Sequence, residues 1–271
     1  MKVTAWRIEA YIQEMSSLRE TDPSVRQAPQ VPHSPLRAYY PREEERREWV
    51  RGLFDRTAGD YERMERLMAL GSGSWYRRRA LQRAGLQTGM SVVDVGVGTG
   101  LVAREAARIA GDSKLVLGVD PSSGMIANAK VPAGVRLAAG AAESIPAADG
   151  SADFISMGYA LRHVSDLPTA FREFHRVLKP GGRLCLLEIT SPRGVFGRVL
   201  LKAYMRGVVP VLAHLVARDR SVPKLMRYYW DTIEACVPPA SILDALAAAG
   251  FVNVIRYVEH GMFSEYRASK P

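Results

Sequence analysis

The chain has 271 residues, a formal net charge of +9 and two cysteines. That length suits one α/β domain with appended helices. Two cysteines do not suggest a disulfide framework or a metal cluster, and no metal site is predicted. Basic residues are interleaved with acids at 42–48, which indicates a solvated helix face rather than a nucleic-acid surface. We find neither an apolar signal region nor an apolar run of membrane-spanning length, so a cytoplasmic protein is expected.

Residues 1–42 are predicted to form an arm, with a helix over 6–18 and a proline-rich linker, before one domain at 43–271. Apolar spacing predicts helices over 43–70 and 75–84. Strands then alternate with helices, and the strands are expected at 92–95, 115–119, 135–138, 153–157 and 183–189, followed by an antiparallel pair at 251–257 and 262–268. The pattern predicts a Rossmann-like α/β fold: a seven-stranded, mainly parallel sheet with an antiparallel C-terminal strand and helices on both faces.

Three glycines, Gly96, Gly98 and Gly100, follow Asp94 at the point where the first strand passes into a helix. Glycine lets a ligand lie directly against the backbone there. Asp120 ends the next strand, so its carboxylate reaches the same sheet edge and can accept hydrogen bonds from a ribose diol. The sequence therefore predicts a nucleoside cofactor.

Two features favour S-adenosylmethionine (SAM) over a dinucleotide or a purely structural turn. An acid at Asp94 would repel a pyrophosphate but suits the ammonium group of SAM. The closing antiparallel pair replaces the further crossover expected in a dehydrogenase. Glu143, after the third strand, can meet the adenine amino group, and Tyr159 is expected to pack over SAM. The predicted cofactor-binding residues are Asp94, Gly96, Gly98, Gly100, Asp120, Pro121, Met125, Ala142, Glu143, Tyr159 and Tyr61.

These motifs resemble the ubiquinone/menaquinone biosynthesis C-methyltransferase family of class I SAM-dependent methyltransferases. The resemblance covers about residues 48–270 and is carried by residues 94–100, 118–122, 161–166, 176–183 and 187–188, with further matches at 54–61, 67–71, 202–204, 209–210 and 227–229. It implies SAM as the cofactor and methylation, at carbon, of a small aromatic or prenylated quinone-like acceptor.

The chain departs from that family where it has His163 in place of the usual asparagine, and also at Gly96, Val97 and residues 229–239. An O- or N-methyltransferase of specialised metabolism therefore remains the alternative. A non-catalytic scaffold with a SAM fold is the alternative from a different class.

His163 is the leading candidate for catalysis, because it follows the fourth strand at the ligand-binding edge. An imidazole with a pKa near 6.5 can take the proton of a phenolic acceptor and make the ortho carbon nucleophilic. The alternative is a structural loop histidine. Arg162 is predicted either to stabilise an oxyanion or to pair with Asp166, and Tyr229 is the next candidate base.

A helical lid is predicted at about 194–240. Within it, residues 196–216 have apolar residues at helical spacing together with cations. Such a segment can line a channel for an apolar substrate, rest on an anionic membrane, or simply pack. We favour the substrate lid and leave peripheral membrane contact and a homodimer open.

Overall fold

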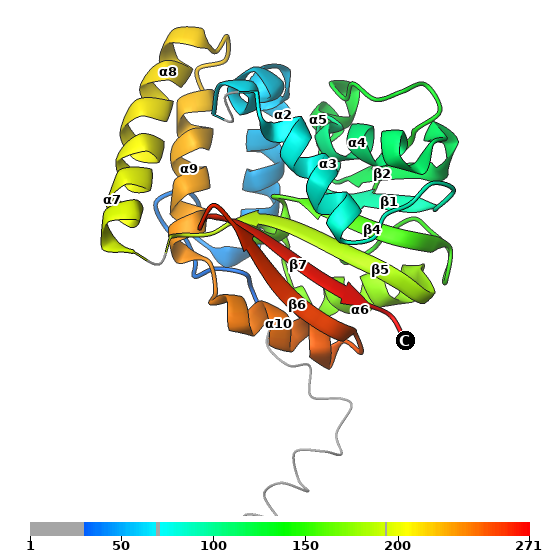
Figure 1. Cartoon of the computed structure of the whole chain (residues 1–271). Helices are drawn as coiled ribbons and strands as arrows, with labels where there is room; N and C mark the ends of the chain where they lie inside the picture. Colours follow the sequence, from blue (N-terminus) through cyan, green and yellow to red (C-terminus); the bar gives the residue numbers. More distant parts are fainter. Residues whose placement is uncertain (1–29, 69–70, 193) are drawn as a thin grey trace, which may run out of the picture.

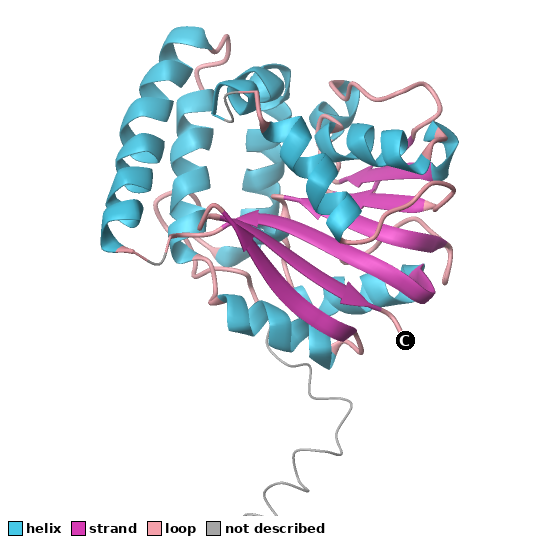
Figure 2. Cartoon of the chain, viewed as in Figure 1, coloured by secondary structure: helices cyan, strands magenta, loops and turns pink. Residues whose placement is uncertain are grey.

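The computed structural model describes residues 30–68, 71–192 and 194–271, so the helix expected at 6–18 lies outside the described residues. One seven-stranded sheet runs in the order β3-β2-β1-β4-β5-β7-β6 (Figure 1, Figure 2). β7 alone runs in the direction opposite to the other strands of the sheet, which confirms the predicted fold. The strands are β1 (Val92–Val95), β2 (Val116–Asp120), β3 (Arg136–Ala139), β4 (Ala152–Gly158), β5 (Leu178–Ile189), β6 (Val252–Glu259) and β7 (Phe263–Ser269).

Helices cover both faces of the sheet, and a further group stands beside it at the end where β1 and β4 finish (Figure 1). One face is covered by α3 and α4, and the other by α6 and α10. The helices are α2 (Glu43–Met68), α3 (Gly73–Arg83), α4 (Leu101–Ala110), α5 (Ser123–Ala127), α6 (Leu167–Val177), α7 (Val195–Ala203), α8 (Val209–Val216), α9 (Val222–Ala235) and α10 (Pro239–Ala248), with short turns η1 (Ser113–Leu115), η2 (Leu161–His163) and η3 (Tyr204–Val208).

Strand β4 shows why this sheet is buried on both faces. Phe154 packs with the α3 and α4 side, whereas Ile155 and Met157 pack with the α6 and α10 side. Successive side chains of a strand point to opposite faces, so both sets must be apolar when both faces are covered. The exception is Ser156, which is buried and donates to the carboxylate of Asp94 on the neighbouring strand.

Strand β5 begins five residues earlier than expected, at Leu178. The strand pairs Leu178 with Ala152 and then skips to pair Arg183 with Phe154, so the intervening glycines form an irregularity within the strand. Residues 179–182, Lys-Pro-Gly-Gly, carry no apolar run that would indicate a strand, so the sequence prediction began at residue 183.

Residues 195–216 form one helix of 22 residues that contains an 18-residue window with a mean hydropathy of 1.5, which meets the length and composition of a membrane span. The expectation that no apolar run reaches that length was therefore wrong. Pro210 does not end the helix, because it lies in the first turn of α8, directly after the π turn η3.

The described part of the arm packs against the domain. The N–H of Leu167 donates to the carbonyl of Gln30 at 3.0 Å, and that of Val237 donates to the carbonyl of Pro32 at 2.8 Å. Tyr40 is 1% exposed. Residues 30–42 therefore pack against the domain predicted for 43–271.

Candidate active site

A cavity of about 380 Å³ opens where β1, β2 and β4 end. Open α/β sheets bind ligands at this edge, and the volume lies within the range of small-molecule pockets. The predicted residues that line it are Gly96, Gly98, Asp120, Pro121, Met125, Ala142, Glu143, Tyr159, Tyr61, His163 and Tyr229. Three predicted residues do not line it: Asp94, Gly100 and Arg162.

The glycine turn forms the floor of the cavity. Gly96 and Gly98 have φ values of 68° and 52°, a region that other residues rarely adopt. A side chain at Gly96 would also collide with Ala160, 2.6 Å from its added Cβ. Gly100 does not line the cavity; it is the N-cap residue of α4 and lies against Val131. The turn thus presents bare backbone at Gly96 and Gly98, against which a ligand can lie.

Asp120 stands at the end of β2 with its carboxylate fixed by two backbone donors. Its Oδ2 accepts from the N–H of Gly98 at 2.8 Å, and its Oδ1 accepts from the N–H of Ser122 at 2.8 Å. Burial raises the pKa of Asp120 to about 6, although these donors favour the charged form. Each oxygen keeps a lone pair, so the carboxylate can still accept hydrogen bonds from a diol in the cavity.

Asp94 lies behind the cavity rather than on its wall. It is 1% exposed, and its Oδ1 accepts from the hydroxyl of Ser156 at 2.7 Å. Burial raises its pKa to about 7. Asp94 therefore does not line the cavity, and its contact with the ammonium group of SAM stays a prediction. Alternation along β1 decides which face the side chain takes, and Asp94 points toward the start of α4.

The loop after β3, where the sequence predicts the adenine end of the cofactor, lines one side of the cavity. Gly140, Ala142 and Glu143 line the cavity beside Pro121 and Met125. Glu143 also reaches across the cavity to the next loop, where its Oε1 accepts from the N–H of Ser165 at 2.5 Å and of Asp166 at 3.3 Å. It therefore joins the two loops that border this part of the cavity.

The opposite part of the cavity is aromatic. The hydroxyls of Tyr61 and Tyr229 lie 2.8 Å apart, and Phe54 meets the ring of His163 edge-on at 5.1 Å. Tyr159 has a φ of 61°, and its N–H donates to the carbonyl of Leu187 at 2.7 Å. A non-glycine residue in this region marks local strain of the kind that gathers at functional sites. The sequence prediction missed Phe54 as a wall residue, although it lies within a motif that carried the family resemblance.

His163 is a neutral imidazole in this setting. Its ring lies between Phe54 and Tyr228, and its Nδ1 is 3.4 Å from the hydroxyl of Tyr228. Its Nε2 is buried and has no hydrogen-bond partner among the described residues. Burial, with the charges of Arg162 and Arg46 nearby, holds the pKa of His163 well below its usual range. The sequence-based value near 6.5 did not include this burial.

Arg162 is buried beneath the aromatic group instead of facing the cavity. Its Nε lies 3.4 Å from Oε2 of Glu188, and its guanidinium stands 5.6 Å from the ring centre of Tyr229. The pairing with Asp166 considered from the sequence is not formed, because Asp166 caps α6 by accepting from the N–H of Thr169. Arg162 thus lies behind the cavity wall, paired with Glu188, and does not line the cavity.

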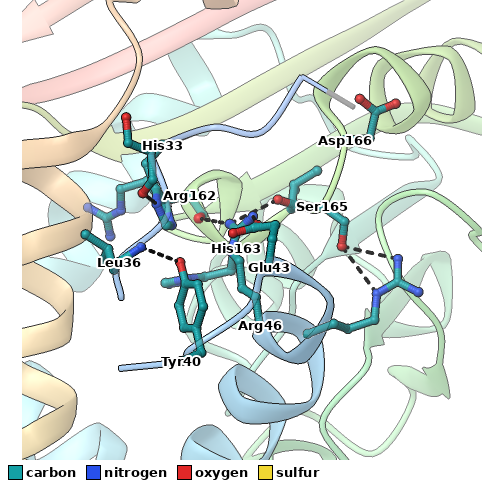
Figure 3. A network of polar contacts seen from close by, with 12 residues as sticks. His33, Leu36, Tyr40, Glu43, Arg46, Arg162, His163, Ser165 and Asp166 are labelled. Atoms are coloured by element: carbon teal, nitrogen blue, oxygen red, sulfur yellow. Dashed lines mark hydrogen bonds and ion pairs between the residues drawn. The ribbon is translucent and has the colours of Figure 1, made fainter. Parts of the chain in front are cut away.

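Arg46, which the sequence prediction missed, ties α2 to the loop that carries His163 (Figure 3). Its Nη2 donates to the carbonyls of Arg162 at 2.8 Å and Val164 at 3.2 Å, and its Nη1 donates to Glu43 at 3.1 Å. The side chain is 4% exposed. Arg46 is therefore a positioning residue for the loop.

We expect Arg46→Leu to lower the free energy of unfolding by about 2 to 4 kcal/mol, because the two loop carbonyls lose charged donors in a buried site. The neighbouring Arg47 is exposed at the rim of the cavity, and its hydrogen bonds within the described residues go to the hydroxyl of Ser165. Arg47→Gln is thus the control and is expected to change stability by less than about 0.5 kcal/mol. Urea unfolding measures the free energy of unfolding of both variants. Equal decreases in the two variants would contradict the assignment of Arg46 as a positioning residue.

The residues of the cavity fit SAM. Bare backbone at Gly96 and Gly98 admits close approach of the ligand, and the fixed carboxylate of Asp120 suits a ribose diol. The aromatic end, with Tyr61, Tyr159 and Tyr229, can stabilise a sulfonium by contact with ring faces. When bound, SAM supplies an electrophilic methyl group.

Comparison with known proteins agrees with this geometry. Residues 42–267 match the model of the ubiE/COQ5 methyltransferase family. The chain is 32% identical over 223 residues to a demethylmenaquinone methyltransferase of Symbiobacterium thermophilum, covering 79% of this chain and 88% of the relative. It is 34% identical over 214 residues to the ubiquinone/menaquinone biosynthesis C-methyltransferase UbiE of Rubrivivax gelatinosus, covering 78% and 82%.

Among solved structures, a SAM-dependent methyltransferase of Thermotoga maritima, described as a possible histamine N-methyltransferase, superposes with a TM-score of 0.57 at 23% identity. The match covers 81% of this chain and 99% of that structure, and it supports the fold alone. From the extent of the family match and the identity of the relatives, the chain belongs to the ubiE/COQ5 methyltransferase family and is a SAM-dependent methyltransferase.

Proposed function

We propose that the protein transfers the methyl group of SAM to a ring carbon of a small aromatic acceptor, a quinol or phenol with an apolar tail. The observation that carries the proposal is the aromatic end of the cavity, where Phe54, Tyr61, Tyr159, His163 and Tyr229 line one continuous wall with the glycine turn. Such a wall suits a flat, electron-rich ring. Relatives named as demethylmenaquinone and ubiquinone/menaquinone methyltransferases support this class of acceptor.

His163 is proposed to take the proton from a ring hydroxyl of the acceptor. Its ring lines the cavity wall, and its depressed pKa keeps it in the neutral, proton-accepting form at neutral pH. A low pKa also makes it a weaker base, so the proton transfer needs the product oxyanion to be stabilised. The buried guanidinium of Arg162, beneath Tyr229, supplies a positive charge near that oxyanion.

The reaction then balances with the residues present. Loss of the hydroxyl proton to His163 pushes electron density onto the ortho carbon of the ring. That carbon forms a bond to the methyl group as the carbon–sulfur bond breaks, which leaves S-adenosylhomocysteine and a ring ketone at the former hydroxyl carbon. The ring regains aromaticity when the methylated carbon releases its proton to solvent and the ring oxygen takes back the proton held by His163. Tyr229 is not proposed as a base, because burial beside Tyr61 raises the pKa of its hydroxyl well above the ordinary value. Tyr61 and Tyr229 serve better as hydrogen-bond partners for a ring oxygen.

Labelled methyl transfer to a matched panel tests the proposal. The panel contains a prenylated quinol, the same quinol without its tail, a simple phenol and an aromatic amine, and NMR locates the label. We expect a carbon–methyl product from the quinols and a lower KM for the prenylated one, because an apolar tail adds buried area. A methyl ether or an N-methyl product as the main outcome would instead support the O- or N-methyltransferase alternative.

A further inference from the structure

The helix formed by α7, η3 and α8 exposes a line of large apolar side chains to solvent. Phe196 is 81% exposed and Leu215 is 73% exposed. Between them, exposed residues recur at helical spacing along one side, and the π turn η3 adds about one residue that keeps the two halves in line. We call this line the apolar row: Phe196, Val199, Leu200, Val208, Val211 and Leu215.

The opposite side of the same helix is anchored in the protein. Met205, Val209 and Ala213 are buried in a core cluster that includes residues of α9. Lys202 and Arg206 form ion pairs with Glu234 and Asp231 of α9, at 2.7 Å and 3.3 Å. Figure 1 shows α7 and α8 at the outer edge of the molecule, with α9 between them and the sheet. A helix held in this way lies along the surface, and crossing a bilayer would break these contacts.

None of the apolar row lines the cavity, where residues 194–240 contribute only Tyr229 of α9 to the wall. The expectation that residues 196–216 line a substrate channel is therefore not met, because the row points away from the site. Exposed apolar area of this extent, on a helix that does not cover the cavity, indicates an interaction surface.

The segment that carries the apolar row is basic. Residues 194–235 carry seven Lys and Arg against three Asp and Glu. Arg198 and, beyond the end of α8, Arg220 and Arg227 are exposed and take part in none of the ion pairs found in the described part of the chain. An apolar face bordered by cations inserts into the headgroup region of an anionic bilayer, where the charges meet lipid phosphates. A second copy of this chain would bring the same positive charges together.

We propose that the apolar row docks the protein on the surface of a bilayer that contains anionic phospholipid, with α7 and α8 lying in the plane of the membrane. The inference does not depend on the identity of the methyl acceptor. The apolar row is the surface by which the peripheral membrane contact considered from the sequence would form. Its partner is an anionic lipid bilayer rather than a second copy of the chain.

Vesicle flotation with the full chain tests the proposal. Binding to phosphatidylcholine vesicles containing phosphatidylglycerol is compared for the parent protein and for Phe196→Ser/Leu200→Ser/Leu215→Ser. A matched control, Val252→Ser/Ile255→Ser/Val258→Ser, removes exposed apolar side chains of the edge strand β6. We expect the first variant to bind at least about tenfold more weakly and the control to bind like the parent.

The charge contribution has its own variant, Arg198→Gln/Arg220→Gln/Arg227→Gln, which is expected to weaken binding to anionic vesicles and to make it insensitive to salt. For every variant, S-adenosylhomocysteine (SAH) affinity and the melting temperature report whether the fold is kept. Phe196→Trp keeps a large apolar side chain at this position, so it provides a fluorescence measurement without a destabilising change. The fluorescence of this variant is expected to shift to the blue on anionic vesicles only.

Three outcomes would overturn the proposal. In the first, the apolar-row variant binds vesicles as well as the β6 control does. In the second, the fluorescence of the Phe196→Trp variant stays unchanged with anionic vesicles. In the third, ultracentrifugation shows a parent dimer that the apolar-row variant dissociates, with no lipid binding by either, and the apolar row then joins two copies. None of these outcomes bears on methyl transfer to a water-soluble quinol. Failure of the membrane-docking proposal is therefore distinguishable from failure of the proposed reaction.

Discussion

Asparagine in place of His163 is expected to lower the turnover number by roughly 10²–10⁴, with SAH affinity nearly unchanged. His163 is the neutral imidazole on the cavity wall whose Nε2 has no partner among the described residues. An asparagine amide can orient a ring hydroxyl but cannot take its proton. Steady-state kinetics and SAH titration separate these two effects.

The matched control is His175→Asn, on α6 and away from the cavity, which is expected to leave turnover unchanged. Because burial depresses the pKa of His163, the imidazole stays neutral on moving from alkaline to mildly acidic pH. The parent rate should therefore fall only at pH values below the ordinary histidine range, near 6.5. Full turnover by the His163→Asn variant would show that His163 has a structural role and is not the base.

Loss of the Asp120 carboxylate is expected to have the largest effect on the cofactor. Asp120→Ala removes charge-assisted hydrogen bonds worth roughly 1.5–3 kcal/mol, which corresponds to SAH affinity weakened by roughly ten- to one-hundred-fold. Asp149→Ala, an exposed carboxylate far from the cavity wall, is the control. Calorimetry that finds equal SAH affinity in the parent and in Asp120→Ala would contradict the assignment of the ribose site.

The pH dependence of SAH binding follows from the same carboxylate. Burial raises the pKa of Asp120 to about 6, and a diol is bound best by the ionised form. SAH affinity should therefore rise as pH increases through about 6 and level off above it, with about a tenfold loss per pH unit well below that value. In Asp120→Ala this dependence should disappear, so the two proteins differ most at neutral pH.

The order of strands and helices could be predicted because both faces of the sheet are covered. Apolar runs such as that of β4 then stand out against the charged and glycine-rich connections. Gly96, Gly98 and Asp120 could be placed in the site because parallel strands bring their carboxyl ends to one edge. The start of β5 could not be predicted, because Lys-Pro-Gly-Gly at 179–182 separates Leu178 from the apolar run and the pairing is irregular there.

The misplaced site residues share one physical cause, which is the direction of a side chain relative to its element. Asp94 lies on the face of β1 that points toward α4, and Arg162 turns inward to Glu188. Arg162 and His163 are consecutive residues of η2, and their side chains point in different directions. Arg162 lies in the core, whereas His163 lies on the cavity wall. Spacing in the sequence places a residue on a loop, but packing against distant elements, here α2 through Arg46, decides where it points.

The helix at residues 195–216 shows the same limit. Its apolar spacing is real, but the sequence does not say whether an apolar side faces the cavity, the core or the surroundings. In the structure one side packs on α9 and the other is exposed. The exposed fraction of Phe196, which only a three-dimensional structure provides, distinguishes a docking surface from a substrate channel.

A structure of the protein with SAH and a reduced quinol analogue would test the proposed site most directly. We expect the ribose hydroxyls within hydrogen-bond distance of the Asp120 carboxylate, and the sulfur facing the aromatic end. The ring of the quinol should lie between that sulfur and His163, with a ring hydroxyl on Nε2. A complex with the ribose away from Asp120, or with the quinol ring out of reach of His163, would contradict the proposed donor site and the proposed base.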